Sequence, residues 1–138
     1  MEYPVNIGGA AEASGVSAKM IRHYEDIGLI PKVSRTTSGY RVYAETDLHM
    51  LRFVRRARNL GFSVKRIGDL LGLWRNRRRE SSKVKALALQ HIAELDARIV
   101  EMTEMRRTLQ HLAGKCHGDD RPDCPILEDL AAQPRAAA

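Results

Sequence analysis

The sequence lacks most features that mark secreted or membrane proteins. It holds only two cysteines, Cys116 and Cys124, too few for the disulfide framework of a small secreted domain. No apolar run approaches the roughly 20 residues that a membrane-spanning helix needs, and the N-terminus shows no signal-peptide pattern. We therefore expect a cytoplasmic protein without a membrane segment, whose two thiols serve a metal ion or a redox reaction.

Glycine and proline are absent from residues 81–113, which predicts one long helix. Ser81 and Ser82 offer hydroxyls to cap its start, and Gly114 can end it. Thirty-odd residues span on the order of 45 Å, too long to fold back on a small domain. Its apolar or small residues recur about every 3.5 positions, the period of a coiled-coil seam, so we expect a two-fold dimer. The seam consists of Val84, Ala88, Ile92, Leu95, Ile99, Met102, Met105, Leu109 and Leu112.

Positive charge is concentrated in the first part of the chain. Residues 1–80 hold 15 Lys and Arg against 8 Asp and Glu, whereas residues 81–138 hold 8 against 9. A basic half is typical of proteins that bind a polyanion, although many basic surfaces are simply solvated. Charge alone therefore leaves nucleic-acid binding open.

Residues 6–28 predict two short helices joined by a tight turn. Small residues form the first helix, the turn contains Gly15, and Ser17 caps the second helix, which runs from Ala18 to about Ile27. This pattern is typical of a helix-turn-helix, whose second helix enters the major groove of DNA, but also of a plain helical hairpin. The second helix would expose Lys19, Arg22 and His23 and turn Met20, Ile21 and Tyr24 inward.

A β-hairpin is predicted over residues 35–43, with a Ser-Gly pair at its turn. Arg35 and Arg41 can neutralise phosphates, and Tyr40 can donate its hydroxyl to them. We assign Tyr43 to the core. A helix-turn-helix followed by such a hairpin is a winged helix.

Two more helices are predicted before the long one. The third follows Ala44, reaches Gly61 and carries several arginines on a mostly solvated face, with one or two able to reach DNA. Ser63 caps the fourth, and residues 75–79 form a charged, solvated linker. The fourth helix would bury Val64, Ile67, Leu70, Leu71 and Trp74.

These residues together resemble the MerR family of transcriptional regulators, and most closely its copper-efflux branch. The resemblance covers residues 5–130 and rests on Ser17-Ala18-Lys19-Met20-Ile21-Arg22-His23-Tyr24-Glu25, Gly28-Leu29-Ile30, Arg35…Gly39-Tyr40-Arg41-Val42-Tyr43 and Arg55…Ala57-Arg58…Leu60-Gly61-Phe62-Ser63. It implies DNA contacts from Lys19, Arg22, Tyr24, Arg35, Tyr40, Arg41 and Arg58. For Tyr24 the family implies a contact while helical periodicity predicts a core residue. His23 stands where relatives often carry an aromatic residue.

The family also implies a mechanism. A dimer would bind double-stranded promoter DNA in a spacer longer than RNA polymerase prefers, and the metal would favour a state that bends and untwists that spacer. An ion shifts such an equilibrium only if it binds the activating state better than the resting state.

Cys116 and Cys124 lie eight positions apart in a predicted loop, packed down by a short helix containing Ile126, Leu127 and Leu130. Two thiolates are too few for an all-cysteine zinc site but suit a soft monovalent ion, namely Cu(I), with Ag(I) and Au(I) as mimics. Relatives that respond to zinc, lead or mercury carry a further cysteine at the start of the long helix, where this chain has Ser81. Asp119, Asp120 and Asp123 are interpreted as turn formers and solvated charges.

Alternatives to a copper site remain. Zn(II) could be completed by His111, His117 or Asp123, and the two thiols could form a reversible disulfide in a redox sensor. An enzyme using Cys116 with His111 or His117 as base lacks an orienting group, so we expect no enzyme. The predicted fold is mainly α: a winged helix-turn-helix DNA-binding domain (1–75), a linker (76–80), a dimerisation helix (81–113), a metal-binding loop with a short helix (114–130) and a disordered tail (131–138).

Overall fold

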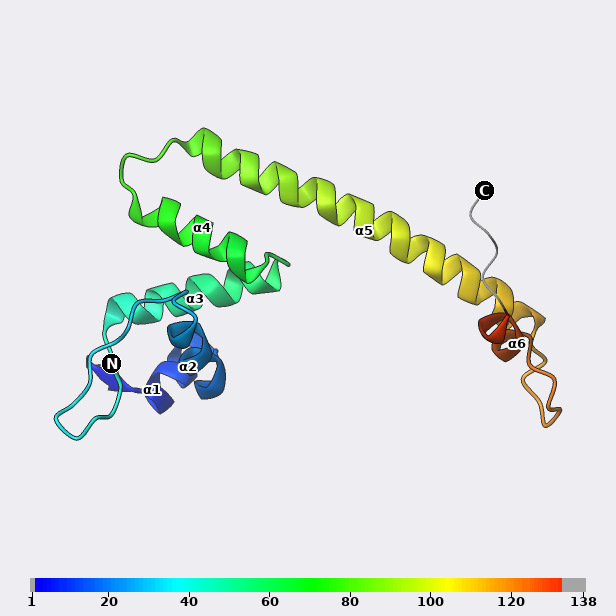
Figure 1. Ribbon diagram of the computed structural model, residues 1–138, viewed down its shortest axis with the longest axis horizontal. Coiled ribbons are helices and arrows are strands. Elements are labelled where there is room, and N and C mark those ends of the chain that lie inside the picture. Colours follow the sequence, from blue (N-terminus) through cyan, green and yellow to red (C-terminus); the bar gives the residue numbers. More distant parts are fainter. Residues whose placement is uncertain (1, 133–138) are drawn as a thin grey trace. The chain divides into compact units, whose positions relative to one another are not determined.

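The computed structural model describes residues 2–132 and is mainly helical, as predicted (Figure 1). The chain forms two units, one up to Ala86 and one from Leu87 onward. The predicted tail lies almost wholly outside the described residues, although Ala131 ends the last helix. In chain order the elements are β1 (Val5–Asn6), α1 (Ile7–Ser14), α2 (Ala18–Asp26), β2 (Val42–Tyr43), α3 (Glu45–Asn59), α4 (Val64–Arg75), α5 (Ser81–Lys115) and α6 (Pro125–Ala131).

Helices α1 and α2 form the predicted helix-turn-helix. Gly15 adopts the left-handed backbone (φ 75°) that ends α1, and the Ser17 hydroxyl accepts a hydrogen bond from the amide of Met20 at the start of α2. A side chain at position 15 would also collide with the guanidinium of Arg55, which lies over the turn. Ile21 is buried as predicted, whereas Met20 is 37% exposed and does not face the core.

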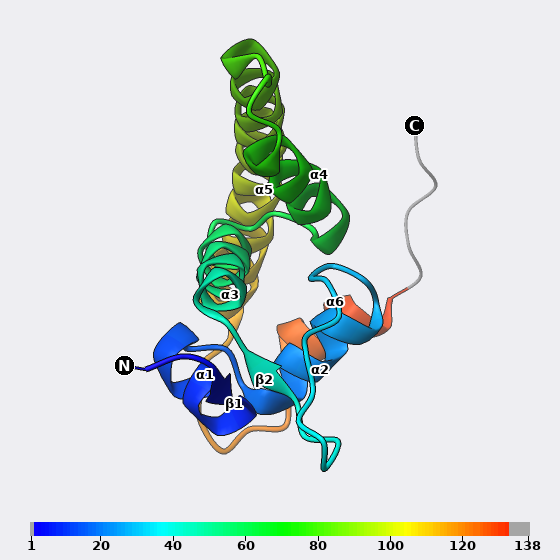
Figure 2. The same ribbon diagram turned by 90° about the vertical axis from the view of Figure 1, so that its left-hand side faces the viewer.

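The hairpin is shorter than predicted and its second strand pairs elsewhere. One isolated bridge joins Arg35 to Arg41, and Gly39 (φ 90°) makes the turn. The next two residues, β2, pair antiparallel with β1 near the N-terminus, with Val5 opposite Tyr43. Figure 2 shows the hairpin projecting away from the helices. The sequence did not reveal β1, because two residues are too few to show a strand's alternation.

Helices α3 and α4 complete the core of the first unit. The amide of Ala44 donates to the Asp47 carboxylate at the start of α3 (2.8 Å), and Ser63 caps α4 by accepting from the amide of Arg66 (3.2 Å). The core contains Ala10, Val16, Ile21, Tyr24, Ile30, Tyr43, Leu48, Met50, Leu51, Val54, Ala57, Ile67 and Leu71. Trp74, predicted to be buried, stays 43% exposed.

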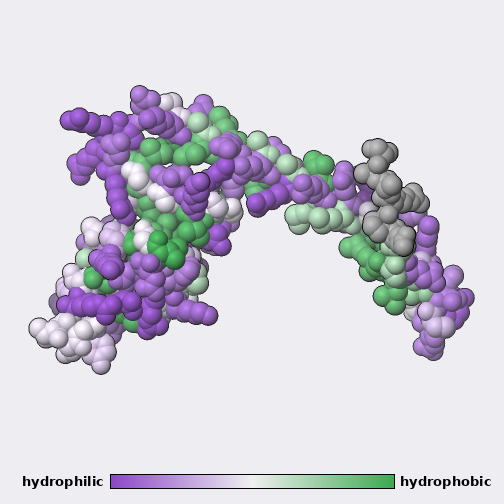
Figure 3. All heavy atoms as spheres, viewed as in Figure 1, coloured by the Kyte–Doolittle hydropathy of each residue, from purple (hydrophilic) through white to green (hydrophobic). Residues whose placement is uncertain are grey.

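Helix α5 starts at Ser81 as predicted and ends two residues later than predicted. Gly114 does not terminate it, because Gly114 keeps a helical backbone and the first left-handed glycine afterwards is Gly118 (φ 65°). Of the predicted seam residues, Ile99, Met102 and Leu109 are 60%, 66% and 56% exposed. Figure 3 shows hydrophobic side chains open to the surface along this helix. No helix within residues 2–132 has both the length and the apolar character to cross a membrane.

Candidate nucleic-acid interface and metal centre

The exposed polar residues of the first unit lie on α2, the hairpin and the end of α3. Lys19 and Arg22 are exposed on α2. Arg35 donates to the carbonyl of Gly39 (2.8 Å), which stiffens the hairpin, and Tyr40 at its tip is 73% exposed. Arg58 is exposed at the end of α3 and donates to the carbonyl of Phe62 (3.3 Å). These five predicted contact residues are therefore all accessible to a polyanion.

Tyr24 differs from those five. Its side chain belongs to the core and is only 6% exposed, as helical periodicity predicts. Its neighbour His23 is exposed, and the two ring centroids lie 6.0 Å apart. Burial favours a packing role for Tyr24, and the DNA contact that the family implies for it stays a prediction.

Arg41, predicted to neutralise a phosphate, already has an acidic partner. Its Nε lies 2.8 Å from the Oε2 of Glu25 on α2, and its Nη2 lies 3.8 Å from the Oδ1 of Asp26. Arg41 is 21% exposed and Glu25 only 6%. Sequence reasoning missed Glu25, although it follows the buried Ile21 by four residues and so lies on the same helix face.

Tyr43 lies in the same cluster, at the base of the hairpin. It is fully buried, and its hydroxyl makes no hydrogen bond to any residue from 2 to 132. Burial, and then the negative charge of Glu25, raise the pKa of Tyr43 above its usual 10.0, while Arg41 and Arg22 oppose the shift. The predicted core position of Tyr43 is confirmed.

The arginines of α3 serve the fold as well as the surface. Arg52 Nε donates to the carbonyl of Ala13 (3.3 Å), and Arg55 covers Gly15. Both side chains therefore hold the turn between α1 and α2, which positions the second helix. Arg58 alone of the predicted contact residues comes from this helix.

The two cysteines flank a loop in the second unit. Cys116 follows the end of α5, and Cys124 is the N-cap residue of α6, whose first residue is Pro125. Both are free thiols and are half-buried. The predicted short helix after the loop is confirmed as α6, but Leu127 and Leu130 are 66% and 70% exposed, so they do not pack it down within the described chain.

No group of three or more His, Cys, Asp or Glu side chains gathers as a metal site anywhere in residues 2–132. Asp119 is engaged by Arg121, with Oδ2 2.8 Å from both Nε and Nη2 of the guanidinium. His111, His117 and Asp123 are exposed. Within the described chain the loop thus has two free thiols, and no third candidate ligand is grouped with them.

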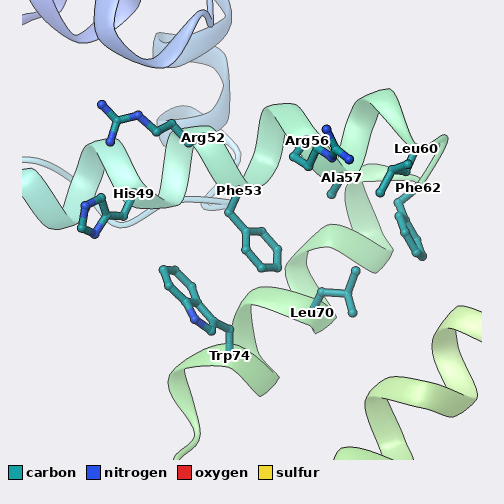
Figure 4. Close-up of a pocket in the computed structure, with 9 residues that line it drawn as sticks. All are labelled: His49, Arg52, Phe53, Arg56, Ala57, Leu60, Phe62, Leu70 and Trp74. Carbon is teal, nitrogen blue, oxygen red and sulfur yellow. The ribbon is translucent and has the colours of Figure 1, made fainter.

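A separate apolar pocket of about 470 Å³ lies between α3 and α4 (Figure 4). The rings of Phe53 and Trp74 stack inside it with centroids 5.3 Å apart. The nine described residues that line it are His49, Arg52, Phe53, Arg56, Ala57, Leu60, Phe62, Leu70 and Trp74. The lining is therefore mostly apolar, with one imidazole and two guanidinium groups.

Comparisons of the sequence with known proteins identify one family along the chain. The pattern of the family "MerR HTH family regulatory protein" matches residues 5–73, and that of "MerR, DNA binding" matches residues 48–112. Heavy metal-dependent transcription regulator 2 of Rhizobium meliloti is 65% identical over 127 residues, which cover 92% of this chain and 86% of the relative. The transcriptional regulator CueR of Escherichia coli O157:H7 is 39% identical over 127 residues, 92% of this chain and 94% of CueR.

The fold also matches a solved structure. The regulator PbrR691 from Ralstonia metallidurans CH34, determined in complex with lead(II), superposes with a TM-score of 0.77 at 30% sequence identity. The match covers 92% of this chain and 99% of that protein.

Proposed function

Because the chain belongs to the MerR family of helix-turn-helix transcriptional regulators, which bind DNA and are not enzymes, we propose that it activates transcription in response to Cu(I). The observation that carries the metal assignment is the loop with two half-buried free thiols and no assembled third ligand in the described chain. Two-coordinate thiolate ligation suits Cu(I), Ag(I) and Au(I), whereas Zn(II) prefers four ligands.

The names of the relatives support a metal effector in general, and copper in particular only through the more distant CueR. Close relatives are named as heavy metal-dependent regulators, and the copper argument is strengthened by the similarity to CueR. The lead(II) complex of PbrR691 supports a divalent ion as the competing candidate. In this chain Ser81 supplies no thiolate at the start of α5, which disfavours that candidate.

MerR-type regulators act as dimers, and α5 supplies the surface for one. Its exposed seam of Ile92, Ile99, Met102, Met105 and Leu109 matches a second copy of the same helix. An antiparallel pair of α5 helices would join two DNA-binding domains, each contacting one half-site of promoter DNA in the cytoplasm. Lys19, Arg22, Arg35, Tyr40 and Arg58 would make the contacts.

The metal would act on the dimer's conformational equilibrium. An ion bound by Cys116 and Cys124 favours whichever dimer state brings the two sulfurs to its preferred geometry. If that state bends and untwists the promoter spacer, RNA polymerase gains access to both promoter elements. Deformation of a site by 40–90° costs on the order of 1–6 kcal/mol, which the difference in metal affinity between the two states must supply.

In vitro transcription of the protein's own target promoter, under strictly reducing conditions, tests this function. We expect activation by Cu(I) at one ion per chain and none by Zn(II) or by a change of thiol redox state alone. Activation by Zn(II) but not Cu(I) would favour the divalent sensor. Activation by an oxidant in the absence of metal would favour the redox sensor.

A further inference from the structure

Glu25 is an acidic residue on the buried face of the recognition helix α2. Its side chain is 6% exposed and follows the fully buried Ile21 by one helical turn. A carboxylate in that position costs free energy unless a cation or hydrogen-bond donors compensate it. Two groups compensate it: Arg41 in the hairpin (residues 35–43) and the amide of Val33 just before the hairpin.

The chain contacts this carboxylate from both ends of the hairpin. Two residues before the outgoing arm begins, the amide of Val33 donates to Oε1 (3.3 Å). On the returning arm, Arg41 Nε lies 2.8 Å from Oε2, close enough for an ion pair although the angle does not form a hydrogen bond. The arms are joined to each other at the bridge between Arg35 and Arg41, where the amide of Thr36 donates to the carbonyl of Tyr40 (2.8 Å) and the amide of Val42 to that of Ser34 (2.9 Å).

Core packing fixes the base of the hairpin but not its tip, because Tyr43 lies in the same buried cluster as Ile21 and Tyr24 of α2. Strand β2 is only two residues long, and its partner β1 belongs to the N-terminal segment and not to α2. The hairpin projects beyond the helices (Figure 2), and Tyr40 in it is 73% exposed. Without the carboxylate, the tip could move relative to α2 while both elements kept their own structure.

We propose that Glu25 is a positioning residue for DNA binding, which fixes the hairpin relative to α2 so that both engage one duplex together. Arg41 acts through Glu25 and not on a phosphate, because its guanidinium is already occupied and mostly buried. This inference rests on the DNA-binding role of the family. Phosphate contacts set the register of a protein on DNA, so a displaced hairpin weakens binding although α2 itself is intact.

If Glu25 positions the hairpin, removing its negative charge lowers DNA affinity, whereas simple electrostatics would raise it. Removing a negative charge from a DNA-facing helix should strengthen binding to a polyanion. Asp26→Asn, at the neighbouring 68% exposed carboxylate, is the matched control and should raise affinity about 2-fold. Glu25→Gln removes the same charge one residue earlier and should lower affinity about 10-fold, the size of one lost contact.

The salt dependence separates positioning from contact. The probe is a duplex selected from a randomised pool by the wild-type protein, with affinities measured by fluorescence anisotropy between 50 and 200 mM KCl. Arg35→Gln should reduce the slope of log affinity against log salt by about 0.9, because a phosphate contact is lost. Arg41→Gln should lower affinity as Glu25→Gln does and leave the slope unchanged.

The double variant Glu25→Gln with Arg41→Gln should lose no more affinity than either single variant, because both remove one interaction. Circular dichroism and thermal unfolding identify any variant that fails to fold. If Glu25→Gln does not fold, the affinity and salt slope of Arg41→Gln test the proposal. Wild-type selection of a duplex tests DNA binding itself, independently of the proposal. An increased affinity for Glu25→Gln, a reduced salt slope for Arg41→Gln, or additive losses in the double variant would each overturn it.

Discussion

The two units of the chain use apolar residues in opposite ways. In the first unit many of them lie inside, where α1, α2, α3 and α4 share one core. Its fully buried members include Ala10, Ile21 and Ile67. In the second, Leu112 is the only buried apolar residue among those described, and the α5 seam is open. The first unit therefore has a core of its own, whereas the second presents a surface that a partner must cover.

Burial of the exposed α5 seam would contribute free energy to dimer formation. Full burial of one Leu, Ile or Met side chain contributes about 1.5–3 kcal/mol. The five seam residues that remain more than half exposed could therefore contribute on the order of 10 kcal/mol to pairing, before the cost of association. This apolar contribution favours pairing of two α5 helices.

The largest expected effect comes from breaking this seam. Leu109→Glu places a charge where the partner helix should pack, so the dimer should dissociate and DNA binding should be lost with the second half-site. Analytical ultracentrifugation and DNA binding measure the two losses. Gln110→Glu adds the same charge at the next residue and should leave both intact. A dimer that survives Leu109→Glu means that the seam is misassigned.

Loss of either cysteine should remove the metal response but not DNA binding. Cys116→Ser and Cys124→Ser should each abolish metal-triggered transcription while leaving DNA affinity nearly unchanged, because each leaves a single thiolate. Parallel transcription and binding assays separate the two functions. His117→Ala is the control within the loop and should retain the response. A response that persists in either serine variant shows that the ion binds elsewhere.

Ser81→Cys should change selectivity. A third thiolate should admit Zn(II), while Cu(I) binding persists because soft sulfur suits both ions. In the structure Ser81 is the first residue inside α5, not the capping position before it, and its side chain is exposed. Zn(II) affinity and Zn(II)-dependent transcription should therefore rise without a loss of stability. A loss of about 1 kcal/mol with no new zinc binding would instead identify Ser81 as a helix cap.

The smallest effect concerns the first unit's own core. Tyr43→Phe removes a buried hydroxyl that has no hydrogen-bond partner among the described residues, so stability should rise by about 1 kcal/mol. Tyr40→Phe, at the exposed hairpin tip, should leave stability unchanged. Thermal unfolding at neutral pH measures both. A destabilised Tyr43→Phe variant would mean that the hydroxyl has a partner in solution.

The same residue gives a pH dependence. Because the pKa of Tyr43 is raised in the folded chain, the unfolded chain loses its proton first as pH rises above about 10. Its contribution to stability is therefore complete below that pH and declines above it. Tyr43→Phe should flatten this alkaline decline in urea unfolding measured from pH 9 to 11. An unchanged decline would assign it to other groups.

The helical elements were predictable because their signals are local. Ser17 and Ser63 cap their helices as expected, and Gly15 ends α1 with the backbone that glycine adopts readily. The cysteine loop and the start of α5 at Ser81 were also visible from spacing alone. Each of these features depends on residues within a few positions of one another.

The contacts between distant segments were not predictable. Strand β1 pairs across 36 or more positions with β2, and the partner of Arg41 lies on a different element. Exposed arginines and paired arginines look alike in a sequence, so the pairing of Arg41 with Glu25 is not visible there. The burial of Glu25 four residues after Ile21 was the available signal, since a buried carboxylate requires a partner.

In the proposed function, the second unit holds a monovalent soft ion between the thiolates of Cys116 and Cys124. X-ray absorption of the fully reduced protein, titrated with Cu(I) to one equivalent per chain, measures the number and type of ligands directly. The account predicts two sulfur ligands and no nitrogen or oxygen, with the signal lost in Cys116→Ser. Three or more ligands, or a nitrogen contribution from His111 or His117, would contradict it.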